Sequence, residues 1–487
     1  MQELAAIVLF SWIPLVLVIF AVLPPRRAVI VTFLLGYLFL PETQYPVSVL
    51  PDFSKTTVTS YALVLAILIF DNNRLSRFRL SWLDVPVLLL CSVDIPTSLL
   101  NGLGAYDGVT RSLAQCISIA IPWFVGRLYF NDLEGLRELA AGIFISGLLY
   151  MPLCLLEIQI SPQLHRMVYG EHAHQFIQTI RYGGYRPTVF LGHGLHVGMW
   201  MTWATLCGIW LFWTRSLTTL FGIPLYLLIA PLAVTTVLCK STGALVLLAM
   251  GCGLLAWVKL ARPSWSAWPI HLLVLCVLLY LGVRITGVWH GAQLIELAGS
   301  IFGSERAQSL NFRIMNERIL TDHAMRQPLF GWGAWNRNRP ADLRVITDSQ
   351  WIIILGVNGL AGLVGFVGML IGPPLLIARR VSTRLWTHPA VSAVPLFAVI
   401  AILTMVDLLL NAGYAPALRA AFGGLAGFQL VRGAPAASWE AMVARMRAAA
   451  QDQEPPETPA QRKTRRRKTT QAGRKGSTGI SFDWPQK

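Results

Sequence analysis

The chain has 487 residues, of which 55% are hydrophobic and only 13% are charged. In soluble globular proteins about a quarter of the residues are usually charged, so this composition excludes a cytosolic enzyme and a disordered protein. The net charge is +16, but half of it lies in residues 462–475, and the mildly basic remainder does not indicate a nucleic-acid-binding body.

Apolar runs dominate the chain from its first residues. A helix needs about 20 mostly apolar residues to cross about 30 Å of hydrocarbon. The runs predict thirteen crossings, at 4–23, 28–41, 57–70, 84–100, 111–130, 138–160, 189–213, 219–238, 241–258, 268–285, 351–377, 390–410 and 414–431. The second and third are short, so we expect an all-α, polytopic transmembrane helix bundle of about 12–13 spans over residues 1–431.

The first run is not typical of a secretory signal peptide, because no basic segment precedes it and Pro24-Pro25-Arg26-Arg27 closes it. All seven cysteines lie within or at the edge of apolar runs. No disulfide framework and no CxxC metal spacing is therefore predicted.

The positions of Lys and Arg in the short loops predict the orientation. With the N-terminus outside, twelve basic residues lie in short inner loops and three, Lys55, Arg111 and Lys240, in short outer loops. Two long loops, about 161–188 and 286–350, then face outward. The larger loop contains an amphipathic pattern at 310–326 and is expected to hold short helices, and connections this long are usually functional or disordered.

The tail at 432–487 is predicted to be cytoplasmic, basic and mostly disordered, because its composition cannot bury a core. Its basic cluster is Arg462, Lys463, Arg465, Arg466, Arg467, Lys468, Arg474 and Lys475. Anionic lipid of the inner leaflet is the predicted partner of this cluster, and a specific protein site is the alternative.

Candidate chemistry gathers on the outer side. Arg181 and Arg186 lie among glycines just before a predicted helix. Glycine lets the backbone come close to a ligand, and the planar arginine guanidinium can donate two hydrogen bonds to a phosphate. Anchoring to lipid headgroups is the alternative for both. His193 and His196 lie three apart on one helix face and are candidate substrate contacts, with helix-to-helix hydrogen bonds as the other reading. No third ligand accompanies them, so no metal site is predicted.

Other polar residues each have a functional and a structural interpretation. Lys240 in a tight outer turn can reach an anionic substrate or extend to the interface. Arg313 and Arg318 can contact substrate, or pair with Glu317 and Asp322 at i and i+4. Asp348 can be an acid or base, or a helix N-cap.

Three carboxylates, on Asp94, Glu157 and Asp407, lie nearest to membrane depth, where a proton- or ion-coupled transporter could use them. Each is near the outer end of its span. No nucleotide-binding fingerprint or nucleophile elbow is present, so neither an ATPase nor a redox enzyme is indicated, and no cofactor is expected.

Four segments over roughly 180–377 together resemble the O-antigen ligase and polymerase superfamily of bacterial membrane proteins. Arg186-Pro187-Thr188-Val189-Phe190 with Gly192 is similar to the family's arginine-bearing segment, and Ser241-Thr242-Gly243-Ala244 to its serine-containing turn. The family's large loop is similar to the stretch from Asn311-Phe312-Arg313 to Pro328-Leu329-Phe330-Gly331-Trp332-Gly333. The start of its following helix resembles the stretch from Asp348-Ser349-Gln350-Trp351 to Asn358-Gly359-Leu360.

The resemblance implies metal-independent glycosyl transfer on the periplasmic face of the bacterial inner membrane, from a glycan on undecaprenyl diphosphate. It implies that arginines, Arg186 first and Arg313 second, stabilise the leaving diphosphate. Lys240 stands near the turn where the family usually has arginine at the position of Thr242. A chain-length regulator is a candidate partner.

One departure favours a polymerase over a ligase. Ligases of the group resemble one another in a histidine where this chain has Asp348, which would need a raised pKa to act as a base. Polymerases resemble one another in an arginine and a glycine spaced as Arg181 and Gly192 are here. The alternatives are a ligase that transfers finished O-antigen to lipid A-core, a transporter of lipid-linked glycans, and a non-catalytic glycan-binding scaffold.

Overall fold

A computed structural model describes residues 2–47, 51–76, 78–173, 175–181, 183–289, 291–334, 336–340, 345 and 349–428. Two earlier predictions, the role of Asp348 and the character of the tail at 432–487, lie outside these residues. Within them the chain is mostly helical, and its four strands form two short hairpins.

Each predicted span coincides with a helix or a helix pair. These helices are α1 (Gln2–Val22), α2 (Pro25–Phe39), α3 (Lys55–Phe70), α5 (Val85–Ser92) with α6 (Asp94–Leu100), α7 (Ala105–Gln115) with α8 (Ile121–Tyr129), α9 (Leu133–Ile160), α11 (Gly194–Trp213), α12 (Leu225–Leu238), α13 (Thr242–Leu260), α14 (Trp268–Ile285), α17 (Gln350–Arg380), α18 (Ala393–Asp407) and α19 (Pro416–Gly427). Short elements between them are α4 (Asn72–Leu75), α10 (Leu164–Tyr169), 3-10 turns η1 (Trp82–Asp84), η3 (Phe176–Thr179), η4 (Pro263–Trp265) and η5 (Thr383–Leu385), and a π-helical turn η2 (Cys116–Ala120).

Among the described residues, seven helical segments are long and apolar enough to cross a membrane: Glu3–Val22, Trp82–Leu100, Leu133–Ile160, Gly194–Trp213, Thr242–Leu260, Pro263–Ile285 and Gln350–Arg380. Many of their large apolar side chains face outward, as Ile7 on α1 and Leu279 on α14 do. An apolar exterior of this kind needs lipid around it. The chain is therefore an all-α bundle compatible with a membrane protein, while the number of crossings and the orientation stay predictions.

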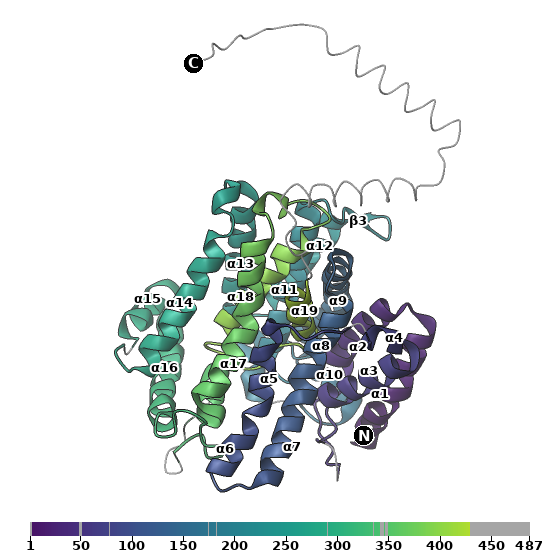
Figure 1. Cartoon of the computed structure of the whole chain (residues 1–487). Helices are drawn as coiled ribbons and strands as arrows, with labels where there is room; N and C mark the ends of the chain where they lie inside the picture. Colours follow the sequence, from purple (N-terminus) through teal and green to yellow (C-terminus); the bar gives the residue numbers. More distant parts are fainter. Residues whose placement is uncertain are drawn as a thin grey trace, which may run out of the picture. The chain divides into compact units, whose positions relative to one another are not determined.

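The centre of the bundle is α18, on which almost every side chain is buried. Figure 1 shows α18 beside α17 and near α11 and α19, with α1 to α4 on one flank and α14 to α16 on the other. Small residues let α8 and α19 approach closely. A Cβ placed at Gly424 would lie 2.6 Å from the carbonyl oxygen of Phe130, so only glycine fits there.

Two predicted spans begin later than the hydropathy indicated. The run at 219–238 opens with a hairpin of β3 (Thr219–Leu220) and β4 (Ile223–Pro224), whose turn residues Phe221 and Gly222 both have positive φ. Positive φ at both turn positions matches the twist of a two-residue hairpin, so α12 starts only at Leu225. The run at 189–213 opens with a turn, and α11 starts at Gly194.

The large loop at 286–350, predicted to face outward, contains α15 (Ala292–Phe302) and α16 (Ser304–Ala324). The helix predicted at 310–326 therefore starts earlier than expected. A buried ion pair attaches α16 to the bundle, because Arg284 on α14 donates to Glu317 on α16 at 2.6 Å and Tyr280 donates to the same carboxylate. Burial raises the pKa of Glu317, and the nearby guanidinium opposes that rise.

The segment after α16 packs against a break in α17. Gly359 interrupts α17 with φ 64° and ψ −163°. The backbone groups that the break frees bond to the preceding loop, with Trp332 N–H donating to Gly356 O at 2.9 Å and Leu360 N–H to Pro328 O at 2.7 Å. A break in an apolar helix is tolerated where other protein groups satisfy the freed backbone, as the preceding loop does here.

Candidate functional site

The predicted arginine-bearing segment is held in place by a single buried carboxylate. Glu157, near the end of α9, accepts backbone N–H hydrogen bonds from Thr188 at 2.8 Å and Val189 at 2.7 Å. Its other oxygen accepts from Leu164 N–H at 2.8 Å. The chain that these bonds hold turns at Val189, whose φ of +51° is not helical, so α11 does not start there. A carboxylate with three backbone donors orders the segment that carries Arg186.

Arg186 lies inside this turn with 7% of its surface exposed. Its guanidinium donates to Ser241 Oγ at 3.0 Å, which links the segment before α11 to the start of α13. The aliphatic part of the side chain lies over Gly194, where an added Cβ would come within 2.8 Å of Arg186 Cδ. Glycine at 194 is thus required for Arg186 to lie flat against the beginning of α11.

Lys240 reaches the same region from the turn between α12 and α13. Its Nζ packs directly against Gly184, where a Cβ would collide with it. Gly184 belongs to β2 (Gly184–Tyr185), which pairs with β1 (Ile180–Arg181) and places Arg181 opposite Gly184. Arg181 is half-buried, and Lys240 makes no ion pair within the described part of the chain. The structure therefore brings Arg186, Lys240 and Arg181 to one hairpin.

A network that the sequence interpretation missed holds the other end of this segment. Glu42, just after α2, accepts from Gly192 N–H at 2.7 Å and forms an ion pair with Lys55 at the start of α3. Lys55 also donates to Tyr37 O at 3.3 Å. The only sequence signal for this pair is that two residues of opposite charge flank neighbouring predicted spans on the same predicted side.

His165 in α10 completes the network. Glu42 N–H donates to its Nε2 at 3.1 Å, and its Nδ1 lies 2.6 Å from Glu171 O. These partners require a neutral ring, with the proton on Nδ1. Burial lowers the pKa of His165 from its ordinary value of 6.5, which agrees with that protonation state.

The two predicted histidines have separate roles. His193 is the N-cap of α11, where its Nδ1 accepts from Leu195 N–H at 3.0 Å, and its Nε2 lies 3.2 Å from Gln178 Oε1. His196 lies one turn on, with Nε2 3.2 Å from Ala412 O. A cavity of about 10 Å³ lies beside His196, enough for about one water molecule. Hydrogen bonding between elements therefore accounts for both rings.

Arg313 contacts the loop between α18 and α19. Its guanidinium donates to Leu410 O and Asn411 Oδ1, both at 3.1 Å. Asn411 in turn donates to Asp407 Oδ1 at 2.7 Å, and Gln350 N–H donates to Asn411 O at 2.9 Å. This loop also contacts His196, so Arg313 and His196 reach one segment from different helices.

Several predicted residues do not join this arrangement. Arg318 is exposed on α16, away from the contacts that Arg313 makes. The predicted pairing of Glu317 within its own helix is replaced by the bond to Arg284 on α14. Asp94 accepts from Asn358 Nδ2 at 2.8 Å. Glu157 accepts from backbone N–H groups and Asp407 accepts from Asn411. Each of the three carboxylates predicted to lie nearest to membrane depth therefore has a hydrogen-bond partner within the protein.

Among the residues that the structure describes, no group of three or more His, Cys, Asp or Glu side chains is placed to hold a metal ion. Comparison of the chain with models of protein families, with characterised proteins and with solved structures finds no match. The geometry around Arg186 is therefore the main indication of function.

Proposed function

We propose that the protein is a membrane glycosyltransferase that polymerises polysaccharide repeat units carried on undecaprenyl diphosphate. The observation that carries the proposal is the position of Arg186, buried and oriented by Ser241, beside Lys240 and the Gly184 hairpin. Arg186 packs against Gly194 and Lys240 against Gly184, and a pair of cations next to glycines suits a diphosphate, because backbone can approach the ligand and the guanidinium offers a planar fork.

In the proposed reaction a hydroxyl of the acceptor glycan attacks the anomeric carbon of the donor sugar. The new glycosidic C–O bond forms as the bond to the lipid diphosphate breaks, and the diphosphate leaves with the electron pair. Arg186 and Lys240 stabilise the charge that grows on this leaving group. A base accepts the hydroxyl proton, and Asp348 stays the predicted residue for that step.

The carboxylate contacts favour this reaction over transport. Glu157 and Asp407 bind neighbouring protein groups, so neither is left as an obvious carrier of a coupling ion, whereas Asp94 binds Asn358 through one oxygen only. A transporter would also be expected to show inverted repeats, which the sequence does not suggest. A ligase that transfers the finished glycan to lipid A-core remains the second candidate within the same chemistry.

The deciding experiment compares lipid-linked intermediates and surface polysaccharide in a strain lacking the gene. Single repeat units accumulating on the lipid, with long chains missing, would establish a polymerase. Long chains stranded on undecaprenyl diphosphate would establish a ligase instead. Repeat units trapped on the inner leaflet would reject both and establish a transporter.

Complementation tests the site itself. Arg186→Ala is expected to reduce polymer formation by about 10²–10³-fold, the usual effect of losing one group that stabilises transition-state charge. Arg186→Lys should rescue poorly, because lysine cannot bind two oxygens in a plane. Arg166→Ala removes an exposed arginine on α10 that is not a candidate substrate contact, and it is the matched control. Normal polymer from Arg186→Ala at normal membrane levels would reject the assignment.

A further inference from the structure

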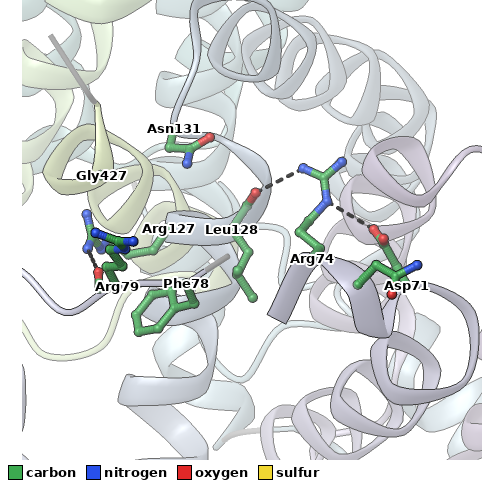
Figure 2. Close-up of a pocket in the computed structure, with 9 residues that line it drawn as sticks. Asp71, Arg74, Phe78, Arg79, Arg127, Leu128, Asn131 and Gly427 are labelled. Atoms are coloured by element: carbon green, nitrogen blue, oxygen red, sulfur yellow. Dashed lines mark hydrogen bonds and ion pairs between the residues drawn. The ribbon is translucent and has the colours of Figure 1, made fainter. Parts of the chain in front are cut away.

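A second basic site lies far from Arg186 in the chain, where the loop at 71–81 meets the ends of α8 and α19. It is a cavity of about 270 Å³, and its lining is Asp71, Asn73, Arg74, Phe78, Arg79, Arg127, Leu128, Asn131 and Gly427. The short loops around it are those that the distribution of Lys and Arg predicts to face the cytoplasm. Figure 2 shows Arg74 on one side of Leu128 and Arg79 with Arg127 on the other.

The charges of the lining are unequal. Three arginines face one carboxylate, that of Asp71, which accepts from Arg74 at 3.0 Å. Arg127 is paired outside the lining, with Asp84 at 3.1 Å. Arg79 is exposed and forms no ion pair in the described part of the chain. The cavity therefore carries an excess of positive charge.

One buried donor in this cavity has no acceptor. Arg127 is 8% exposed, and it donates from its terminal nitrogens to Arg79 O at 2.7 Å and Ala426 O at 3.2 Å. Its Nε has no hydrogen-bond partner among the described residues. A buried N–H without an acceptor is destabilising, and an anionic oxygen bound close to the Arg127 guanidinium offsets part of that cost through its charge.

The surroundings of the cavity are those of a lipid-facing surface. Phe78 and Leu128 line it, and the adjoining residues Leu80, Trp82 and Val85 expose 65%, 63% and 58% of their surfaces. Tryptophan is enriched at the interface between hydrocarbon and headgroups. An acyl chain can therefore lie on this surface while a phosphate enters the cavity.

We propose that this cavity binds the phosphate of an anionic phospholipid headgroup, with Arg79 and Arg127 as the main contacts and Arg74 supplying further positive charge. Basic pockets between membrane helices on the cytoplasmic side are suited to such headgroups. A soluble phosphate is also anionic but would gain nothing from the exposed apolar residues beside the cavity.

Native mass spectrometry of the full-length protein in neutral detergent tests the proposal. Phosphatidylglycerol should be retained preferentially over phosphatidylcholine, and Arg79→Gln should weaken its retention by about fivefold, the effect of one basic residue near a lipid surface. Arg79 is exposed, so its replacement leaves the packed interior intact. Arg380→Gln, at an exposed site at the end of α17, removes the same charge elsewhere and should retain the lipid as the unchanged protein does.

Three outcomes would overturn the proposal. Equal retention of the two lipids would show that charge is not recognised. Equal loss in Arg79→Gln and Arg380→Gln would show a general electrostatic effect. Displacement of phosphatidylglycerol by an equimolar amount of inorganic phosphate would assign the cavity to a soluble anion. None of these outcomes depends on the proposed glycosyl transfer.

Discussion

The backbone N–H of Val189 donates to the carboxylate of Glu157 at 2.7 Å, across 32 positions of the chain. The same oxygen accepts from Thr188, so one buried carboxylate decides where the chain turns before α11. Arg186 lies three residues before Val189, so the turn fixes the position of its backbone. An acidic residue that looked like a candidate for ion coupling thus has a structural role in positioning an arginine.

Glu157→Gln should therefore weaken both the fold and the function. The amide keeps one acceptor oxygen but loses the charge that strengthens its bonds to backbone N–H groups, at a cost of about 1–3 kcal/mol of stability. We expect a lower melting temperature in detergent and reduced polymer formation, because Arg186 is no longer held. Glu296→Gln, exposed on α15, is the control. An unchanged melting temperature in Glu157→Gln would contradict the assigned role.

His165 should make stability depend on pH. Its folded-state pKa lies below the ordinary 6.5, chiefly because of burial; Glu42 and Glu171 favour its protonation and Lys55 opposes it. The unfolded chain then binds more protons, so this contribution is fully present above pH 6.5 and is lost as pH falls through the lowered value. Protonation of His165 at Nε2 also puts a hydrogen on the atom that accepts the Glu42 N–H, so that hydrogen bond is lost.

Thermal unfolding in detergent between pH 7.5 and 5 checks this expectation. The protein should lose stability on acidification, and His165→Gln, with a neutral acceptor at all pH values, should lose less. His271→Gln removes an exposed histidine on α14 and should follow the unchanged protein. Parallel pH curves for the two variants would refute the assignment.

Gly331 should not tolerate a side chain. Its φ is +66°, and an added Cβ would lie 2.6 Å from Gly359 N. Gly331→Ala should therefore destabilise the protein by roughly 2–4 kcal/mol, since backbone strain and a backbone collision add together. Gly253→Ala, at a helical position with nothing near its added Cβ, should be neutral or slightly stabilising. Comparable melting temperatures for the two variants would argue against the tight contact at the break in α17.

The ion pair of Arg284 and Glu317 should behave as a buried pair. Arg284→Met leaves a carboxylate uncompensated and is expected to cost about 3–5 kcal/mol. Replacing both, with Arg284→Met and Glu317→Leu together, should cost much less, because no isolated charge remains. Hydrogen exchange of α16 would report the difference locally, and Arg318→Met on the exposed face should change little. Single and double variants with equal losses would contradict the coupling.

The apolar runs were enough to predict the helices. A helix satisfies its own backbone groups, so a run such as 241–258 predicts α13 without knowledge of its neighbours. Where a predicted boundary was wrong, either a local turn, as in the hairpin before α12, or a tertiary contact decided it. The run at 189–213 is apolar from its first residue, yet α11 starts at Gly194 because the backbone at Val189 has a non-helical, positive φ in the turn that Glu157 binds.

The sequence by itself determined a helical chain with an apolar exterior and the chemical character of its loops, because hydropathy and charge are properties of each residue. Only the tertiary structure decided which charges meet. Glu42 reaches Lys55 and Gly192, Glu317 reaches Arg284 rather than Arg313, and Lys240 packs on Gly184. Such pairings depend on which helix ends lie together, and that follows from the packing of the whole bundle rather than from local spacing.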